Sequence, residues 1–112
     1  MIHEMRLQPR YYDDIQNGTK RIELRLYDEK RSQIQLGDKI RFFKEPELTE
    51  KMEVDVIGLL RYQSFTELLK DFDISIFADS SMTKEELLKV LEGFYPVEKQ
   101  KEYGVLGIRI HL

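Results

Sequence analysis

Two stretches of the chain alternate apolar and polar side chains, which is the period of a half-buried β-strand. The first covers residues 19–27 and has polar side chains and a tyrosine on its second face. The second covers residues 105–112 and has glycine, arginine and histidine on its second face. We therefore predict a strand in each stretch. The apolar positions are Ile22, Leu24 and Leu26 in the first and Leu106, Ile108, Ile110 and Leu112 in the second.

Three further stretches predict strands with weaker alternation: residues 2–7, 39–44 and 52–62. The last of these changes parity at Gly58, and glycine inside a strand is typical of a bulge or a barrel corner. Residues 28–35 are polar and predict a loop or a frayed helical turn, and residues 45–50 predict an acidic hairpin-like loop.

Three helices begin at recognisable positions. Pro9 suits the first helical position, and Asn17 followed by Gly18 supplies a left-handed end, which predicts a helix over about 9–17. Ser64 and Thr83 are each followed by glutamate three residues later, which is the capping-box pattern. We expect these helices to run to about 71 and 93, and we expect residues 97–102 to form a short charged turn.

About five strands with short helices inserted between them predict the α+β class and a small, partly closed β-barrel. The 112 residues are room for one domain, which we expect to cover residues 1–112. Phe42, Phe65 and Phe94 are expected in its core.

Composition narrows the class of protein. The chain is 41% hydrophobic and 35% charged, and it has no cysteine. Cysteine-based zinc sites, thiolate nucleophiles and disulfides are therefore excluded, and a cytoplasmic location is expected. The longest uncharged apolar run, residues 56–60, is far shorter than the ~20 residues of a membrane span, so no membrane partner is predicted.

The charge is unevenly distributed. The net charge of −3 disfavours a general nucleic-acid binder, which normally has a basic excess. Residues 1–44 carry 10 Lys and Arg against 7 Asp and Glu, whereas residues 45–112 carry 8 against 14. An anion site is therefore expected in the first half, although solvent-facing strands are often rich in lysine and arginine without binding anything. The acidic second half leaves open a protein-interaction module.

The sharpest local motif is Gly18-x-Lys20-x-x-Glu23-x-Arg25, where a predicted helix ends and a strand begins. Glu23 and Arg25 share one strand face, about 6–7 Å apart. The long stem of Lys20 can reach around the strand end toward the same place. Two cationic donors and one acceptor suit a nucleotide, because Glu23 can accept from a base edge. A strand-end ion pair, worth about 0–1 kcal/mol if exposed, is the alternative.

This motif resembles the GxKxxExR signature of the ASCH family, whose domains are similar to RNA-binding PUA domains. The resemblance implies a PUA-like barrel with the signature lining a cleft, and RNA or a nucleotide-like molecule as partner, with no cofactor. Other parts of the chain also resemble the small single-domain members. These are Gly37-Asp38, Tyr62-x-Ser64-Phe65, Phe94-Tyr95-Pro96 and Tyr103-Gly104-Val105-Leu106.

Further side chains are expected beside the signature. Arg21, Lys39 and Arg41 extend its positive surface. Tyr27 and Tyr103 offer rings on which a base can stack, with rim packing as the alternative. The complete predicted ligand-binding set is Gly18, Lys20, Arg21, Glu23, Arg25, Tyr27, Lys39, Arg41 and Tyr103.

One branch of the ASCH family hydrolyses the acetyl amide of a modified cytidine with lysine, threonine and glutamate. The resemblance places that lysine on Lys20, but the threonine falls on Glu23. The acidic residue falls near Ser80 and Ser81, with Asp79 one step earlier. A lysine acts as a base only if its pKa is lowered, and an adjacent carboxylate raises it. Hydrolysis of an acylated nucleoside such as N4-acetylcytidine, with Lys20 and Glu23 catalytic, is therefore the alternative function.

The two histidines, His3 and His111, lie in the first and last predicted strands. If those strands are neighbours in a barrel, a two-histidine metal site is conceivable. Neither histidine has a carboxylate at ligand spacing, so we predict a surface or core-edge position for both and no metal site. The sequence leaves the oligomeric state open.

Overall fold

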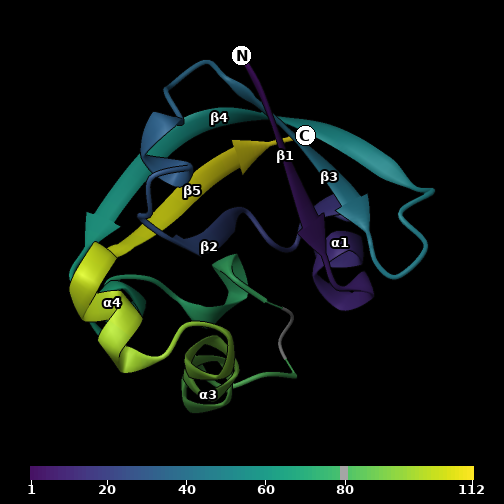
Figure 1. Ribbon diagram of the computed structural model, residues 1–112. Helices are drawn as coiled ribbons and strands as arrows, with labels where there is room; N and C mark the ends of the chain where they lie inside the picture. Colours follow the sequence, from purple (N-terminus) through teal and green to yellow (C-terminus); the bar gives the residue numbers. More distant parts are fainter. Residues whose placement is uncertain (79–80) are drawn as a thin grey trace.

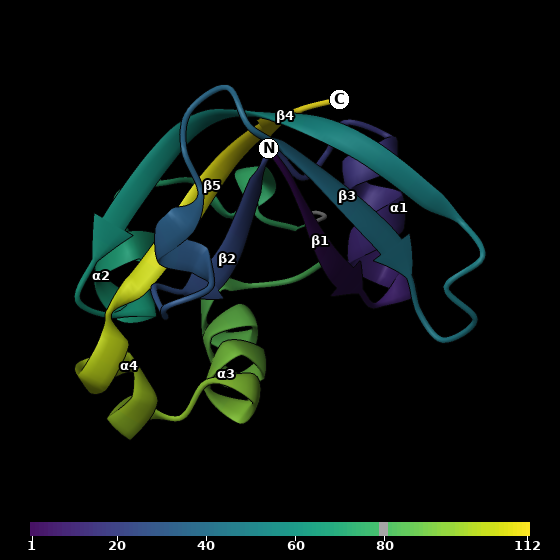
Figure 2. The same ribbon diagram turned by 45° about the horizontal axis from the view of Figure 1, so that its top comes forward.

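A computed structural model describes residues 1–78 and 81–112 of the chain. Five strands form one curved sheet in the order β1-β3-β4-β5-β2. Strands β1 and β3 are parallel, and the other neighbouring pairs are antiparallel. Figure 2 shows the edge strands β1 and β2 diverging, so the sheet is a half-barrel. The strands are β1 (Ile2–Leu7), β2 (Ile22–Leu26), β3 (Lys39–Lys44), β4 (Lys51–Tyr62) and β5 (Val105–His111).

Short helices lie beneath this sheet, with α3 below the arch of strands in Figure 1. Within the described residues, no helix is long and apolar enough to span a membrane. The α+β half-barrel confirms the predicted fold class. The helices are α1 (Pro9–Gln16), α2 (Phe65–Lys70), α3 (Lys84–Phe94) and α4 (Val97–Tyr103), with 3₁₀ turns η1 (Arg31–Gln33) and η2 (Ile74–Ile76).

Two hydrophobic cores flank strand β5. The core inside the curve of the sheet includes Phe42, Val54 and Ile108, with α1 contributing Tyr12. The second core lies between the other face of β2 and β5 and helices α2 and α3, and Phe65 and Phe77 are fully buried there. Successive residues of β5, such as Val105 and Leu106, thus enter different cores, as the period of two requires.

Strand β2 is covered on both faces, which explains why its polar side chains are buried. Ile22 and Leu24 pack into the second core. Glu23 lies on the opposite face and is only 5% exposed. The alternation of apolar and polar residues along β2 therefore separates two different buried environments, and its polar face is not a face exposed to solvent.

Most predicted elements are confirmed, with small shifts at their ends. Gly18 has a φ of +86° after α1, as the left-handed end required. Thr83 and Glu86 form the predicted capping box, and Ser64 accepts a hydrogen bond from the Glu67 amide. The pairing of β4 with β5 shifts register between Val56 and Gly58, which confirms the bulge.

Two predictions about the C-terminal third were wrong. Residues 97–103 form helix α4 and not a charged turn, because Gln100 anchors it. The Gln100 side chain accepts from the Phe65 amide and donates to the Tyr95 carbonyl. Phe94, predicted in the core, ends α3 with a side chain that is 57% exposed.

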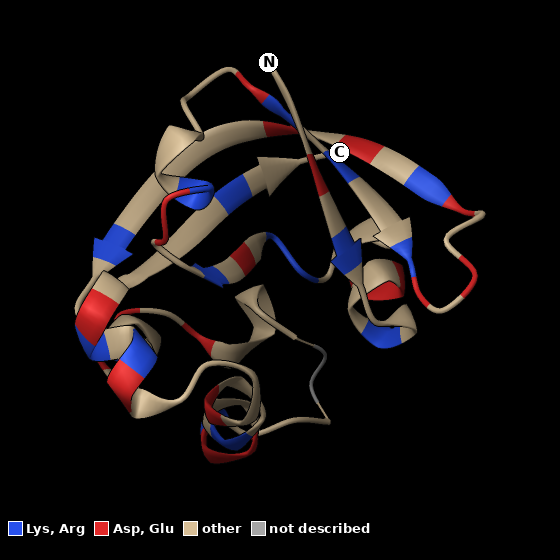
Figure 3. Cartoon of the chain, in the orientation of Figure 1, with Lys and Arg blue, Asp and Glu red and all other residues tan. Residues whose placement is uncertain are grey.

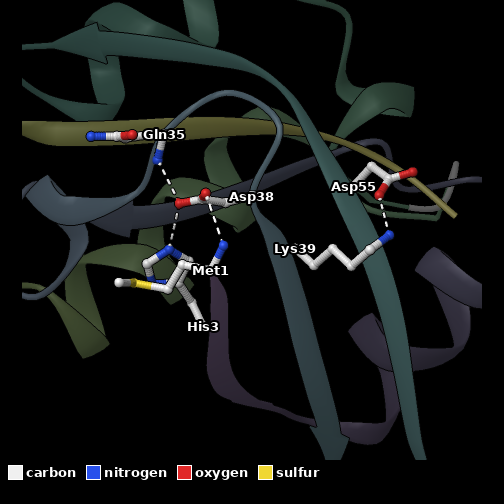
Figure 4. Close-up of polar contacts among 6 residues, drawn as sticks. All are labelled: Met1, His3, Gln35, Asp38, Lys39 and Asp55. Atoms are coloured by element: carbon white, nitrogen blue, oxygen red, sulfur yellow. Dashed lines mark hydrogen bonds and ion pairs between the residues drawn. The ribbon is translucent and has the colours of Figure 1, made fainter.

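The two histidines lie apart, because β3 and β4 separate β1 from β5. Figure 4 shows His3 beside Asp38, and 2.8 Å separates its Nε2 from a carboxylate oxygen. The Asp38 carboxylate also accepts from the Gln35 amide and from the Met1 ammonium. This contact cluster fixes the start of β1 to the turn that precedes β3.

The outer face of the sheet carries a network of ion pairs, here called the outer network. Arg41 contacts Glu53 at 2.7 Å and Glu4 at 3.4 Å, so the three side chains join β3, β4 and β1. Lys39 contacts Asp55 at 2.7 Å on the same two central strands. Figure 3 shows blue segments on β3 beside red segments on β4.

Candidate ligand pocket

A pocket of about 270 Å³ opens between the edge strands of the half-barrel and helix α3. One end is polar and carries the side chains of the sequence motif, and the other end is apolar and formed by α3. The lining residues are Arg6, Leu7, Gln8, Tyr11, Lys20, Glu23, Leu24, Arg25, Glu45, Leu87, Val90, Leu91, Phe94 and Tyr95.

Lys20 is buried at the polar end because the chain folds tightly between α1 and β2. Its backbone amide donates to the Asp14 carbonyl, which turns the chain back after Gly18. Its ammonium donates to the carbonyls of Ile22 and Phe77, at 2.9 and 3.1 Å. Glu23 supplies a third acceptor at 3.3 Å. The three hydrogens of the ammonium therefore each have an acceptor within reach.

Glu23 is the centre of the polar end. One carboxylate oxygen faces Lys20 and accepts from the Leu24 amide at 3.1 Å. The other accepts a hydrogen bond from Nε of Arg25 at 2.9 Å and lies 2.8 Å from Nη2. A hydrogen bond between two charged groups is stronger than one between neutral groups. Both oxygens of Glu23 are thus engaged by neighbouring groups of the protein.

Arg25 joins the two open edges of the half-barrel. Its Nη2 also donates to the Arg6 carbonyl at 2.9 Å, so a β2 side chain bonds to the β1 backbone. A further hydrogen bond joins the Arg25 guanidinium to the Tyr95 side chain. Glu23, the Arg6 carbonyl and Tyr95 together fix the plane of the guanidinium at the pocket.

Burial and charge shift the pKa values of this cluster in opposite ways. Burial lowers the pKa of Lys20 below its usual range, although the adjacent Glu23 carboxylate opposes the shift. Burial alone would raise the pKa of Glu23, but the cations of Arg25 and Lys20 outweigh it and lower that pKa. Glu23 is therefore a carboxylate at neutral pH.

The apolar end of the pocket is a slot against α3. Leu87 and Leu91 are buried, whereas Phe94 stands exposed at the mouth. Tyr95 follows directly, with its ring 5.7 Å from that of Phe65 and 6.3 Å from that of Phe94. Burial raises the pKa of Tyr95, so its hydroxyl stays protonated and can donate a hydrogen bond.

The structure brings together only part of the predicted site. Lys20, Glu23 and Arg25 converge on the pocket, as their spacing indicated. Gly18 shapes the turn before Lys20 but does not line the pocket, and neither does Arg21, whose backbone bonds to Ile76 and Ile110.

Four other predicted residues lie elsewhere. Lys39 and Arg41 belong to the outer network and contact acidic side chains. The Tyr27 ring is covered by the Arg61 guanidinium at 3.7 Å, and Tyr103 lies 5.8 Å from the Lys99 ammonium. A role in binding for these four residues stays a prediction.

Several pocket residues were missed by the sequence reasoning. Tyr11 lies 5.5 Å from the Lys20 ammonium, measured to its ring centroid. Gln8 and Tyr95 also line the pocket. Each of these two directly precedes a proline, in Gln8-Pro9 and Tyr95-Pro96, and such chain breaks next to a helix were the available signal.

The structure describes only part of the segment in which the acidic residue of a hydrolase was expected. Asp79 and Ser80 lie outside the described residues. Ser81 accepts a hydrogen bond from Nη2 of Arg10 at 3.1 Å. No group of three or more histidine, aspartate or glutamate side chains in residues 1–78 and 81–112 has the arrangement of a metal site.

Comparison with known proteins gives a consistent result. The family model for the ASCH domain matches residues 5–112, nearly the whole chain. No curated protein matches the chain. Among solved structures, the crystal structure of hypothetical protein PH0355 is 43% identical, with a TM-score of 0.88 over 99% of this chain and 98% of that one.

Two further solved structures are similar. The solution NMR structure of protein PF0455 from Pyrococcus furiosus is 39% identical, with a TM-score of 0.78 over 99% of this chain and 96% of that one. A mutant of ZmASCH from Zymomonas mobilis has a TM-score of 0.69 over 99% of this chain and 68% of that one. Its identity of 11% indicates a shared fold alone.

Proposed function

The chain belongs to the ASCH domain family, and from this premise we propose that it binds one nucleotide unit, free or within RNA, in the pocket beside Arg25. One observation carries the proposal: the pocket joins an apolar slot to a hydrogen-bonding end with buried charges. A nucleotide has the same division, with a flat base that stacks and polar edges that hydrogen-bond.

The size and charge of the pocket support the binding of a single nucleotide unit. The volume of about 270 Å³ lies at the lower limit of ligand pockets, which range over roughly 300–1,000 Å³. Arg6, Lys20 and Arg25 outnumber Glu23 and Glu45 among the lining side chains, which favours a ligand with negative charge. In this arrangement the base lies against α3 and Tyr95, and Arg25 donates to an oxygen of the ligand.

Glu23 has a positioning role in this proposal. It accepts a hydrogen bond from Nε of Arg25, forms an ion pair with Nη2, and thereby orients the guanidinium that touches the ligand. Lys20 balances the buried carboxylate from the other side. The signature residues thus form one unit in which Arg25, held by Glu23 and Tyr95, presents its guanidinium to the pocket.

The test is a titration of the protein with uridine 5′-monophosphate, monitored by NMR through its backbone amide resonances. We expect shifts at Arg25, Leu91 and Tyr95. The Arg25→Lys variant keeps the positive charge beside Glu23 but loses the planar fork, so the affinity should fall about tenfold. The matched control is Lys51→Gln, at the first position of β4 and outside the pocket lining, and this variant should bind the nucleotide normally. Binding that is unchanged in Arg25→Lys would overturn the proposal.

A hydrolase acting on an acylated nucleoside is the second candidate. The observation in its favour is that burial lowers the pKa of Lys20, as a catalytic base requires. The three acceptors around the ammonium oppose it, because they stabilise the protonated form.

Incubation with N4-acetylcytidine separates the two candidates. Chromatography then measures release of cytidine by the wild-type protein and by Lys20→Arg, which keeps the charge but does not deprotonate. We expect no cytidine from either protein. Rapid release that Lys20→Arg abolishes would establish the hydrolase in place of the binding protein.

A further inference from the structure

A second cationic site lies where β2 and β4 end, outside the pocket described above. The guanidinium carbon of Arg61, at the end of β4, stands 3.7 Å from the centroid of the Tyr27 ring. Such stacking holds a guanidinium flat and leaves its N–H groups at the edge available. The stack therefore orients a forked donor before any ligand arrives.

Within the part of the chain that the structure describes, the cations of this site have no acidic partner. In residues 1–78 and 81–112, neither Arg61 nor Lys101 forms an ion pair, whereas Arg25, Arg31 and Arg41 each contact a carboxylate. A guanidinium that forms no ion pair and is already oriented by stacking is available to donate hydrogen bonds to an anion. The nearby acid Glu102 is engaged by Lys99 at 3.7 Å.

A hollow adjoins these cations and gives an anion room to enter. Its lining has the charges of Arg61 and Lys101, the amide of Gln63 and no acidic side chain. Gly104 lines the hollow with a φ of +74°, and an added Cβ there would approach the Tyr62 carbonyl to 3.2 Å. The composition suits an oxyanion such as a phosphodiester.

The register of β2 connects this site with the pocket. Tyr27 continues the strand face that carries Glu23 and Arg25, since residues two apart lie on one side. Arg25 and Tyr27 are therefore separated by about 6–7 Å along the chain direction. That step matches one residue of an extended nucleic acid strand, so a unit in the pocket directs its neighbour toward Arg61.

We propose that Arg61, Lys101 and Gln63 bind the phosphodiester group of the nucleotide next to the one in the pocket. This inference rests on the proposed function and specifies its ligand as an oligonucleotide. Arg61 supplies the fork, Tyr27 fixes the plane of that fork, and Lys101 adds the second positive charge. Free mononucleotides reach only the pocket and gain nothing from this site.

The experiment compares uridine 5′-monophosphate with the 5′-phosphorylated dinucleotide pUpU by calorimetry. Arg61→Gln should weaken pUpU about tenfold, the scale of one charge-assisted contact, and leave the mononucleotide unchanged. Arg61→Lys should lose less affinity for pUpU than Arg61→Gln does, because it keeps the positive charge. Lys51→Gln removes a positive charge from the other end of β4 and is expected to bind both ligands as the wild type does.

The outcomes separate this inference from the proposed function. Equal losses for both ligands in Arg61→Gln, or no loss for either, overturn the phosphodiester site. If the wild type binds pUpU through Arg61 but ignores the mononucleotide, the second site stands and the pocket proposal falls. If the wild type binds neither ligand, both are wrong.

Discussion

Lys20 shows how burial and hydrogen bonding oppose each other within one side chain. Removing its ammonium from water is costly, and the side chain is only 4% exposed. Two carbonyls and the Glu23 carboxylate offset that cost by accepting its hydrogens. Because Glu23 depends in turn on Lys20 and Arg25, the cluster is stable as a whole and sensitive to the loss of a member.

Replacing Lys20 by methionine should therefore destabilise the fold. The substitution leaves Glu23 buried with one cation fewer and two carbonyls without their donor, for which we expect a loss of about 3–5 kcal/mol in the free energy of unfolding. Urea denaturation measures it. In the double variant Lys20→Met, Glu23→Gln, the loss should be smaller than the sum of the two single effects. A single-variant loss below about 0.5 kcal/mol, typical of a surface position, would show that the pair is not buried in solution.

The candidate site could be predicted from sequence only where it follows strand parity. Glu23 and Arg25 share a face in any strand, and Lys20 is near enough to join them, so their convergence was predictable. Tyr95 enters the same pocket from a segment 70 residues after Arg25, through packing that no local pattern encodes. The burial of the cluster was equally hidden, because alternation does not tell a solvent face from a second core.

At the scale of elements, the bulge in β4 depends on a close approach between strands. A Cβ built on Gly58 would lie 2.8 Å from Cδ and 3.0 Å from Cβ of Arg109 on β5. That space is filled by the partner strand, so glycine is required by packing at this position.

Gly58→Ala and Gly93→Ala should therefore change stability in opposite directions. We expect Gly58→Ala to destabilise by about 1–3 kcal/mol, the range for overpacking, because Arg109 must move. Gly93 lies inside α3 with nothing within 4 Å of an added Cβ, so Gly93→Ala should stabilise by about 0.5–1 kcal/mol. Thermal unfolding compares both with the wild type, and a neutral Gly58→Ala would contradict the packing argument.

Elements with local signals were predictable, and elements fixed by distant contacts were not. The capping box of Thr83 and Glu86 marks α3 from four residues of sequence. Helix α4 has only seven residues and no side-chain hydrogen bond at its N-cap, and it is held by the bond between Gln100 and the distant Phe65 amide and by a nearer bond to the Tyr95 carbonyl. Its sequence therefore resembles a charged turn until the partner segments are known.

The contact cluster of Asp38 links β1 to the turn before β3 and makes that link depend on pH. Hydrogen bonds from His3 and from the Gln35 amide lower the pKa of Asp38 from 3.8 to about 2. The folded state thus binds its proton less readily than the unfolded chain. The resulting stability is present above pH 3.8 and is lost as pH falls through about 2.

Asp38→Asn tests this dependence. The melting temperature of the variant should lie below that of the wild type at pH 5, and the difference should shrink as pH falls to about 2. Asp73→Asn is the control. It removes an aspartate whose pKa is also lowered, but by a hydrogen bond from the Ser75 amide within its own turn. A difference between Asp38→Asn and the wild type that is constant across this pH range would contradict the linkage.

On the scale of the whole molecule, charge limits how nucleic acid can be bound. The net charge is −3, and the outer network neutralises Lys39 and Arg41. If the proposed function holds, RNA binding must depend on a few local contacts and not on a general positive field.

RNA binding should consequently be weak and sensitive to salt. With about three phosphate contacts on a single strand, the logarithm of the affinity should fall with the logarithm of salt concentration with a slope near −2. Titration of labelled single-stranded RNA at several salt concentrations gives the slope directly. A slope near zero, or no binding at low salt, would favour a small-molecule or protein partner in place of RNA.

The outer network also has a consequence for heat resistance. Hydration of charged groups becomes less favourable as temperature rises, because it orders water and carries a negative entropy. The penalty for bringing Glu4, Arg41 and Glu53 together therefore falls on warming, whereas exposed ion pairs near 25 °C contribute only about 0–1 kcal/mol each. Strands β1, β3 and β4 are accordingly joined by contacts whose relative contribution grows as the protein approaches its melting point.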